Sequence, residues 1–311
     1  MRVPPEMQSA WTEYWKTGHF ESLPEDRAAG RLGSLDSAWI KFFSSLSDGA
    51  RLLDLATGGG DVIRRALALG RNFTITGVDL ADLSAVSAAL QAPGVELVGN
   101  TDLSKLPFPD AVFDGVTSQF GIEYADPAAA AREAIRVLAP GGHGHFVLHH
   151  AGGAITQGVA NSLAADRSVF TDGSAFQLGR AVFGLRQGSA TSATIAEAEE
   201  GFRKAVAALQ SRVGNERAFV PARNAVTFLA DLARSPGLIP AAEALRRIAI
   251  VEGEIYARTL RKKAQLDAAV DRKGVDNFAR LLTGAGAVVD SPLELKYPMG
   301  KLMAWSLSFH K

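Results

Sequence analysis

The chain has 311 residues, and its 33 Lys and Arg residues balance 33 Asp and Glu residues to give a formal net charge of zero. This length allows a sizeable buried core, while zero net charge argues against nucleic acid as a partner, because phosphate binding usually leaves a basic footprint. The chain has no cysteine, which excludes disulfides, thiolate metal sites and cysteine nucleophiles.

No targeting or membrane segment is expected from the sequence. Residues 1–10 contain prolines and charged residues but no apolar stretch of the kind found in a signal peptide. The apolar runs elsewhere are far too short to span a bilayer. We therefore expect a cytoplasmic protein without stable membrane insertion.

Residues 1–48 are predicted to be mostly helical. Trp11, Tyr14 and Trp15 follow the i, i+3, i+4 spacing that places three aromatic rings on one helix face. This face either packs on the core or covers a flat ligand, and the two interpretations are compatible. We expect residues 1–48 to form a helical lid.

Residues 49–150 alternate strand and helix patterns, which predicts parallel strands joined by helical crossovers. The expected fold is α/β, a doubly wound, mostly parallel, seven-stranded Rossmann-like sheet. Its expected strands are residues 51–56, 73–80, 95–98, 112–118 and 144–148. Its expected helices are residues 62–69, 84–90 and 127–138.

The pattern changes at residue 151. Residues 151–285 are Ala-rich with helical spacing, and Thr194-x-x-Glu197 resembles a capping box that opens one of the helices. A segment of this length is too long for a loop, so we expect a helical cap or substrate subdomain. Its core is predicted to include Phe170, Phe176, Phe183, Phe202 and Phe228. Residues 286–311 are predicted to return to the sheet as an antiparallel strand pair, 287–295 and 302–310.

A glycine-rich turn follows the first predicted strand, and an acidic residue ends the second. Gly58, Gly59 and Gly60 let a ligand approach the backbone closely, and the next helix offers free N–H groups. Asp79 lies where a carboxylate can accept both hydroxyls of a ribose. The pattern indicates a nucleoside-containing cofactor at the carboxyl ends of the strands, although a plain strand-to-helix turn would use the same glycines.

Charge separates two classes of cofactor at this turn. A dinucleotide site is typically G-x-G-x-x-G, with pyrophosphate at the helix N-terminus. Here the chain reads A-T-G-G-G-D, and we expect Asp54 and Asp61 to repel a pyrophosphate and to suit a ligand with an ammonium group. This favours the methionine end of S-adenosylmethionine.

Four segments in chain order resemble class I S-adenosylmethionine-dependent methyltransferases, especially those of the ubiquinone/menaquinone-biosynthesis type. They are LLDLATGGGDV, GVDL, GNTDLSKLPFPDAVFDGVTSQFGIEY and AAREAIRVLAPGGHGHFV. The resemblance covers about a third of the chain directly and barely touches the helical insertion. It implies S-adenosyl-L-methionine as the cofactor.

The resemblance also implies roles for individual residues. Asp79 would bind the ribose diol, Leu80 would flank the adenine, Asp102 would bind the adenine amino group, and the Leu103 backbone would meet the ring. Leu103 replaces the family's usual Ala. The residues implied around the methionine end are Asp54, Ala56, Gly58, Gly60, Gln119 and Phe120, with Ala56 standing where the family often has its first glycine.

Methyl transfer is an in-line displacement that needs a general base only if the nucleophile arrives protonated. His149 and His150 follow the fifth predicted strand at the substrate edge, and each is also open to a purely structural role. Glu123 and Tyr124 follow the fourth strand, where Tyr124 could line the pocket or shield the sulfonium through a cation–π contact. A metal site would need His143 and His145 as well, but strand alternation splits these histidines between faces, so no metal is expected.

The acceptor is predicted to be a small, fairly apolar molecule, such as a quinone precursor or a secondary metabolite. The chain lacks the N/D-P-P-Y/F run of amino-methylating base methyltransferases. Two alternatives stay open, a nicotinamide-dependent oxidoreductase and a non-catalytic S-adenosylmethionine-binding protein. The sequence decides neither the accepting atom nor the oligomeric state, and a homodimer is among the options.

Overall fold

The structure, a computed structural model, describes residues 5–19, 22–168, 175–213 and 220–311. The chain folds into two compact units. The first comprises residues 1–157 and 264–311, and the second comprises residues 158–263. The lid and cap roles expected for parts of the chain stay predictions.

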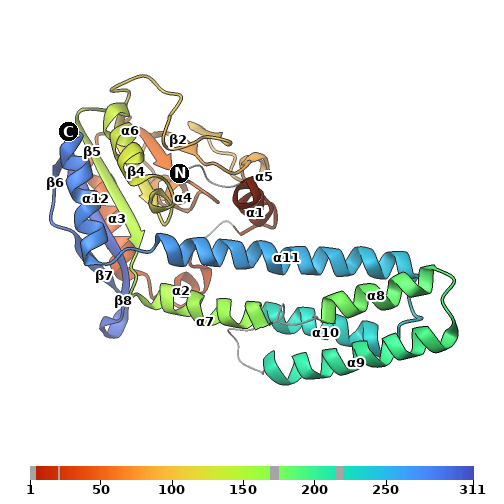
Figure 1. Cartoon of the computed structure of the whole chain (residues 1–311). Coiled ribbons are helices and arrows are strands. Elements are labelled where there is room, and N and C mark those ends of the chain that lie inside the picture. The colour runs from red at the N-terminus through yellow and green to blue at the C-terminus, as the bar shows by residue number, and fades with distance from the viewer. Residues whose placement is uncertain (1–4, 20–21, 169–174, 214–219) are drawn as a thin grey trace. The chain divides into compact units, whose positions relative to one another are not determined.

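The first unit is built around a mixed sheet (Figure 1). Its strand order is β3-β2-β1-β4-β5-β8-β6, and β7 also pairs with β8. Strands β1 to β5 run parallel, and β8 is antiparallel to β5, which confirms the predicted fold class. The strands are β1 Arg51–Leu55, β2 Thr74–Val78, β3 Val95–Val98, β4 Phe113–Gln119, β5 Leu138–His149, β6 Val288–Val289, β7 Leu293–Lys296 and β8 Leu302–His310.

Two predicted strands differ from the structure by more than one or two residues at an end. The described residues form eight strands rather than seven, because the predicted strand 287–295 is divided into β6 and β7, which both pair with β8. Strand β5 begins at Leu138 rather than residue 144. Leu138 already pairs with Phe113 across an irregular register, so pairing overrides the turn signal of Pro140 and the two glycines after it.

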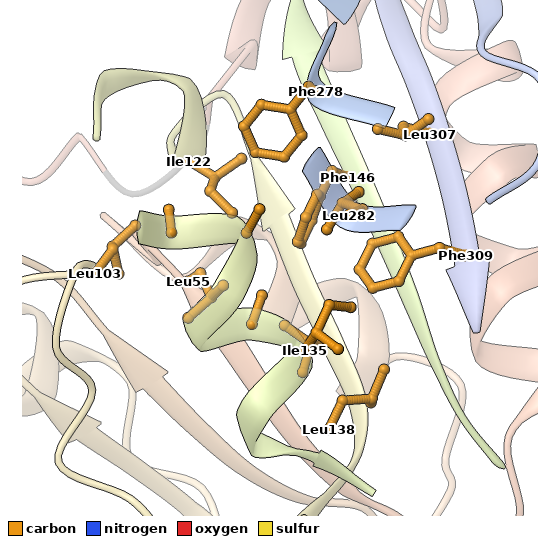
Figure 2. Close-up of a cluster of buried hydrophobic side chains, with 14 of the residues drawn as sticks. Leu55, Leu103, Ile122, Ile135, Leu138, Phe146, Phe278, Leu282, Leu307 and Phe309 are labelled. Atoms are coloured by element: carbon orange, nitrogen blue, oxygen red, sulfur yellow. The ribbon is translucent and has the colours of Figure 1, made fainter. Parts of the chain in front are cut away.

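Helices cover both faces of the sheet. The helices of this unit are α1 Pro5–Lys16, α2 Pro24–Ala28, α3 Gly33–Ser45, α4 Asp61–Leu67, α5 Ser84–Ala89, α6 Pro127–Val137 and α12 Arg272–Gly284, with the short 3-10 turns η1 Ile122–Tyr124 and η3 Pro298–Gly300. Side chains of α6 and α12 form one apolar cluster with the sheet, in which Phe146, Phe278 and Phe309 lie close together (Figure 2). Side chains of α3 and α4 form the cluster on the other face.

The second unit is helical. Its helices are α7 Ala154–Ser168, α8 Ala175–Gln187, α9 Ser192–Val213, α10 Val220–Arg234 and α11 Ala241–Ala268, where the first turn of α7 and the end of α11 belong to the sheet unit. Phe176, Phe183 and Phe202 are fully buried in its core, and Phe228 is half-buried against it. Phe170 lies outside the described residues.

The predicted capping box is wrong by one turn. Thr194 is inside α9, and its backbone N–H is bonded to Oγ1 of Thr191 at 3.2 Å. Thr191 therefore caps the helix, which starts three residues before the predicted position.

One ion cluster is buried inside the helical unit. Asp166 on α7 is fully buried and accepts two hydrogen bonds from Arg258 of α11, Nε to Oδ2 at 2.9 Å and Nη2 to Oδ1 at 3.0 Å. Lys262 also contacts the carboxylate, and burial lowers the pKa of this lysine. Two cations thus share one carboxylate.

No helix in the described part of the chain is long and apolar enough to cross a membrane.

Candidate active site

The candidate site lies at the carboxyl edge of the parallel strands. Strands β1 and β4 are neighbours, but the helices that follow them, α4 and α6, pack on opposite faces of the sheet. Such a switch in direction opens a crevice outside the strand ends, where ligands bind in this kind of fold. Ala56 and Phe120 directly follow these two strands with φ of 51° and 56°, a conformation that non-glycine residues rarely adopt.

The glycine turn follows β1, and α1 lies against it. Gly58 and Gly60 have φ of 51° and 82°, which favours glycine at both positions. A Cβ atom added at Gly58 would lie 2.5 Å from Cζ2 of Trp15. The helix that carries the three predicted aromatics therefore covers the turn with one of them.

Asp79 directly follows β2 and lies beside this turn. Its Oδ2 accepts a hydrogen bond from the Gly58 N–H at 2.9 Å, and its Oδ1 accepts one from the Ala81 N–H at 2.9 Å. The side chain is buried, and burial raises its pKa. Each oxygen keeps a lone pair, so the carboxylate fits the predicted partner of a ribose diol.

Asp54 is buried behind the turn. Thr57 and Thr117 donate hydroxyl hydrogen bonds to it at 2.6 and 2.8 Å. Burial raises the pKa of Asp54 to about 7, and the charges of Asp61 and Asp79 act in the same direction. The carboxyl therefore carries only part of its charge near neutral pH.

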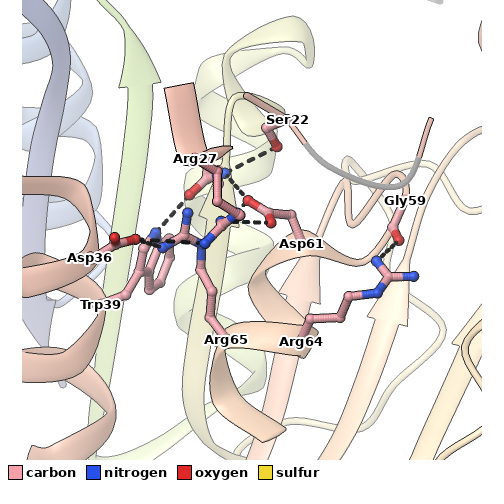
Figure 3. A network of polar contacts seen from close by, with 9 residues as sticks. Ser22, Arg27, Asp36, Trp39, Gly59, Asp61, Arg64 and Arg65 are labelled. Atoms are coloured by element: carbon pink, nitrogen blue, oxygen red, sulfur yellow. Dashed lines mark hydrogen bonds and ion pairs between the residues drawn. The ribbon is translucent and has the colours of Figure 1, made fainter. Parts of the chain in front are cut away.

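Asp61 begins α4 and is held by a network of polar contacts (Figure 3). Arg27 donates to Oδ1 at 3.1 Å, while Arg65 and the Gln119 amide donate to Oδ2 at 3.3 and 2.8 Å. The Gln119 oxygen accepts a bond from Trp39 Nε1 at 2.7 Å. Gln119, predicted to lie beside the methionine moiety, is a buried connection between α3, α4 and β4.

This network bears on the prediction made from charge. Asp61 does not present an uncompensated negative charge to a ligand, because Arg27 and Arg65 flank it. The pairing with two arginines weakens the expected repulsion between Asp61 and a pyrophosphate, which stays a prediction.

The predicted adenosine residues lie on the loops after β2 and β3. Leu80 is half-buried, and its carbonyl accepts a bond from Gln8 Nε2 on α1 at 2.9 Å. The side chain of Asp102 is exposed, with Oδ1 bonded to the Ser104 N–H at 2.8 Å. Leu103 is buried. Helix α1 thus contacts the loop on which the adenine is expected.

A continuous set of aromatic rings runs from α1 to the end of β5. Trp11 is stacked on Trp15 with ring centroids 5.9 Å apart and meets Tyr124 edge-on at 5.8 Å. Tyr124 in turn meets His149 edge-on at 6.1 Å. Burial, with the nearby charge of Glu123, raises the pKa of Tyr124 well above its usual value, so its hydroxyl stays protonated.

His149 pairs with Glu123. Glu123 Oε1 accepts hydrogen bonds from the His149 backbone N–H at 2.9 Å and lies 2.8 Å from ring Nδ1. Both side chains are buried, and the imidazole is stacked on Phe120 at 4.5 Å. A histidine oriented by a carboxylate is an arrangement suited to general-base chemistry.

The other predicted histidines lie elsewhere. His150 is stacked on Trp305 with centroids 4.6 Å apart, and its Nδ1 accepts a bond from the Gly152 N–H at 2.9 Å. His145 is buried beside Trp39, and burial lowers its pKa to about 4. His143 is exposed. Across the described residues, no group of three or more His, Asp or Glu side chains is placed to hold a metal ion.

Together, the strand order, the glycine turn and Asp79 define a nucleoside-cofactor-binding α/β protein. Comparison with known sequences narrows this class. Residues 53–146 match the family described as "Methyltransferase domain". This segment is a class I S-adenosylmethionine-dependent methyltransferase domain, as the motifs predict.

Two curated proteins are similar to this part of the chain. The chain is 41% identical over 96 residues to a demethylmenaquinone methyltransferase of Thermus thermophilus, covering 30% of this chain and 44% of that protein. It is 31% identical over 157 residues to a ubiquinone/menaquinone biosynthesis C-methyltransferase of Roseobacter denitrificans, covering 41% and 63%. The matched segment thus spans under two thirds of either relative.

A crystal structure from Rhodobacter sphaeroides, named "Putative Zn-dependent Alcohol Dehydrogenases", aligns with 100% of this chain and 99% of its own, with a TM-score of 0.50 at 12% identity. A likeness at this identity shows the fold alone.

Some site residues carried no sequence signal. Arg27 and Arg65 meet Asp61 across very different sequence separations, and Gln8 reaches Leu80 from 72 residues away. Arg65 and Asp61 have the i, i+4 spacing of one helix, which the sequence did offer, whereas no local spacing encodes the contacts of Arg27 and Gln8. Glu123 had a positional signal after the fourth strand, but its pairing with His149 depends on the register of β5 beside β4.

Proposed function

We propose that this protein transfers the methyl group of S-adenosylmethionine to a small, fairly apolar acceptor. The observation that carries the proposal is the Asp79 carboxylate, bonded to the glycine turn at Gly58 within a methyltransferase domain. The curated relatives support a quinone-like acceptor, because their names specify demethylmenaquinone and ubiquinone/menaquinone biosynthesis.

The residues at the strand ends fit this cofactor. Asp79 has one free lone pair on each oxygen for the two ribose hydroxyls, and Asp54 lies behind the turn where an ammonium group would favour its charged form. When bound, S-adenosylmethionine supplies a methyl group on a positively charged sulfur. Tyr124, which stays protonated, offers its ring to that charge.

In this proposal, His149 takes a proton from the acceptor. Its ring is buried at the end of β5, beside Tyr124, which Trp11 of α1 contacts in turn, and we take this position as the place where a flat acceptor would bind. His150 has no such position, because Trp305 covers its ring. The residues of the chain orient the acceptor and remove its proton. Alignment of the accepting atom with the methyl carbon supplies most of the rate enhancement.

Titration calorimetry with S-adenosylmethionine and S-adenosylhomocysteine tests the proposal first. Binding of both is expected, and Asp79→Asn should weaken binding about 100-fold, because bonds to a charged acceptor contribute about 1.5–3 kcal/mol each. Asp114→Asn is the matched control, since Asp114 accepts the Arg51 N–H at the amino end of the strands. No binding of either compound, or binding of NADH instead, would contradict the proposal.

Turnover tests the acceptor class. Demethylmenaquinol with a short prenyl chain is the probe, and transfer of a labelled methyl group from S-adenosylmethionine is the readout. Cofactor binding without transfer to this probe would overturn the quinone-like acceptor, and would leave the cofactor assignment standing.

A further inference from the structure

We propose that Glu123 is a positioning residue that fixes the proton of His149 on Nδ1, so that Nε2 faces the acceptor as the base. The assignment of a base rests on the proposed function. The tautomer itself does not, and it can be measured without any cofactor or acceptor.

A single carboxylate oxygen holds both N–H groups of the histidine. Glu123 Oε1 is 2.9 Å from the His149 backbone nitrogen and 2.8 Å from ring Nδ1. The backbone N–H can only donate, so Oε1 is an acceptor there, and an ionised oxygen can accept a second bond from Nδ1–H. This leaves the lone pair of the neutral ring on Nε2.

The Glu123 carboxylate lies in surroundings that disfavour an unpaired charge. The Glu123 side chain is 1% exposed, and its Oε2 has no hydrogen-bond partner among the described residues. Buried polar atoms without a hydrogen-bond partner are few in folded proteins, and a role in orienting His149 would account for this one. The stacking of Phe120 and the edge contact of Tyr124 hold the ring that this carboxylate orients.

His150, the next residue in the chain, also lies near a glutamate, but its ring nitrogens have different partners. His150 Nδ1 accepts the Gly152 N–H at 2.9 Å, so its proton is expected on Nε2, which lies 3.9 Å from Glu294. Two adjacent histidines, each near a glutamate, are therefore expected to have opposite tautomers. Only the tautomer of His149 leaves Nε2 basic.

This arrangement selects an acceptor whose reacting atom carries a proton, such as a phenol or an enol. For methylation on oxygen, the O–H bond breaks, its proton goes to His149 Nε2, and its electron pair forms the bond to the methyl carbon. For methylation on a ring carbon of a hydroquinone, the O–H proton again goes to His149 Nε2, a π electron pair of the resulting phenolate forms the bond to the methyl carbon, and the hydrogen on that ring carbon then leaves as a proton and the hydroxyl is restored. The electron pair of the broken sulfur–carbon bond stays on sulfur. The imidazolium then donates Nδ1–H to Glu123, which stabilises the new charge.

Long-range ¹H–¹⁵N spectra of the full chain labelled at histidine test the tautomers at alkaline pH. His149→Asn and His150→Asn identify the two signals. We expect Nδ1–H for His149 and Nε2–H for His150, and Glu123→Leu should shift His149 toward Nε2–H. The conservative variant Glu294→Gln, beside His150, should leave the His149 signal unchanged.

Turnover of demethylmenaquinol separates positioning from a structural role. Glu123→Gln keeps an oxygen for Nδ1–H and removes the charge, so kcat should fall at least tenfold with little change in KM or in cofactor affinity. Nε2–H on His149 in the unmodified protein, or unchanged kcat in Glu123→Gln, would overturn the inference. Cofactor binding together with Nε2–H would reject this inference alone, whereas failure to bind the cofactor would reject the proposed function.

Discussion

The two units of the chain bury charge in different ways. The sheet unit holds Asp54, Asp61, Asp79 and Glu123 out of solvent at the carboxyl ends of its strands. In the helical unit, the charged side chains mostly form exposed pairs three or four residues apart, and Asp166 is the one buried charged side chain within its described residues.

This difference separates a unit that is stabilised by its apolar core from a unit that keeps buried carboxylates at a candidate site. Exposed pairs contribute little to stability, so the helical unit depends on its apolar core. Buried carboxylates are costly unless paired, and a folded protein keeps several together where they have chemistry to perform. Three variants test this comparison, from the largest expected effect to the smallest.

Removing Asp166 should cause the largest loss of stability. Asp166→Ala leaves Arg258 and Lys262 without their carboxylate, although both are mostly buried. Breaking such a cluster costs about 3–5 kcal/mol. Urea denaturation measures the loss, with Asp166→Asn as a milder variant. A change below about 1 kcal/mol would show that water already screens these cations.

Replacing Asp54 should increase the stability of the protein at high pH, in contrast to the loss of stability expected for Asp166→Ala. Its folded pKa of about 7 lies above the ordinary value of 3.8, so the folded state holds this proton more tightly than the unfolded chain. The resulting stabilisation is complete below about pH 4 and is lost as the pH rises through 7. One pKa unit corresponds to about 1.4 kcal/mol, so the effect is on the order of a few kcal/mol.

Asp54→Asn removes this titration while keeping the shape of the side chain. Its melting temperature relative to the original protein should therefore rise between pH 5 and pH 8. Thermal unfolding at several pH values measures the difference. A difference that does not vary with pH would show that Asp54 is ionised throughout.

An exposed pair in the helical unit should have the smallest effect. Asp231 and Arg234 are 3.0 Å apart and are 62% and 73% exposed. Asp231→Asn should change the free energy of unfolding by no more than about 0.5 kcal/mol. A larger loss by urea denaturation would mean that surface pairs, and not only the core, stabilise this unit.

The sequence predicted the parts of the site that local pattern encodes. Strand ends, glycine turns and helix starts depend on neighbouring residues, so the positions of Gly58 and Asp79 followed from spacing. The pairing of Asp61 with two arginines was not predicted, and these come from α2 and from the next turn of α4. Only the folded chain brings Arg27 to it.

The two histidines show the same limit at shorter range. Alternation along a strand predicts that His149 and His150 point to opposite faces, but it does not say which one meets a carboxylate. That depends on the position of Glu123 after the neighbouring strand and on Trp305 in β8. The metal-free expectation for these residues stays a prediction.

Trp15 has a consequence for the order of events at the site. The ring occupies the space directly beside the Gly58 backbone, and Trp11 and Tyr14 contact it from the same helix. A ligand that touches the turn from that side can arrive only when α1 has moved away. We therefore expect the exchange of S-adenosylhomocysteine for S-adenosylmethionine to require α1 to move away from the turn. The residence time of S-adenosylhomocysteine should then depend on the contacts that Trp11, Tyr14 and Trp15 make.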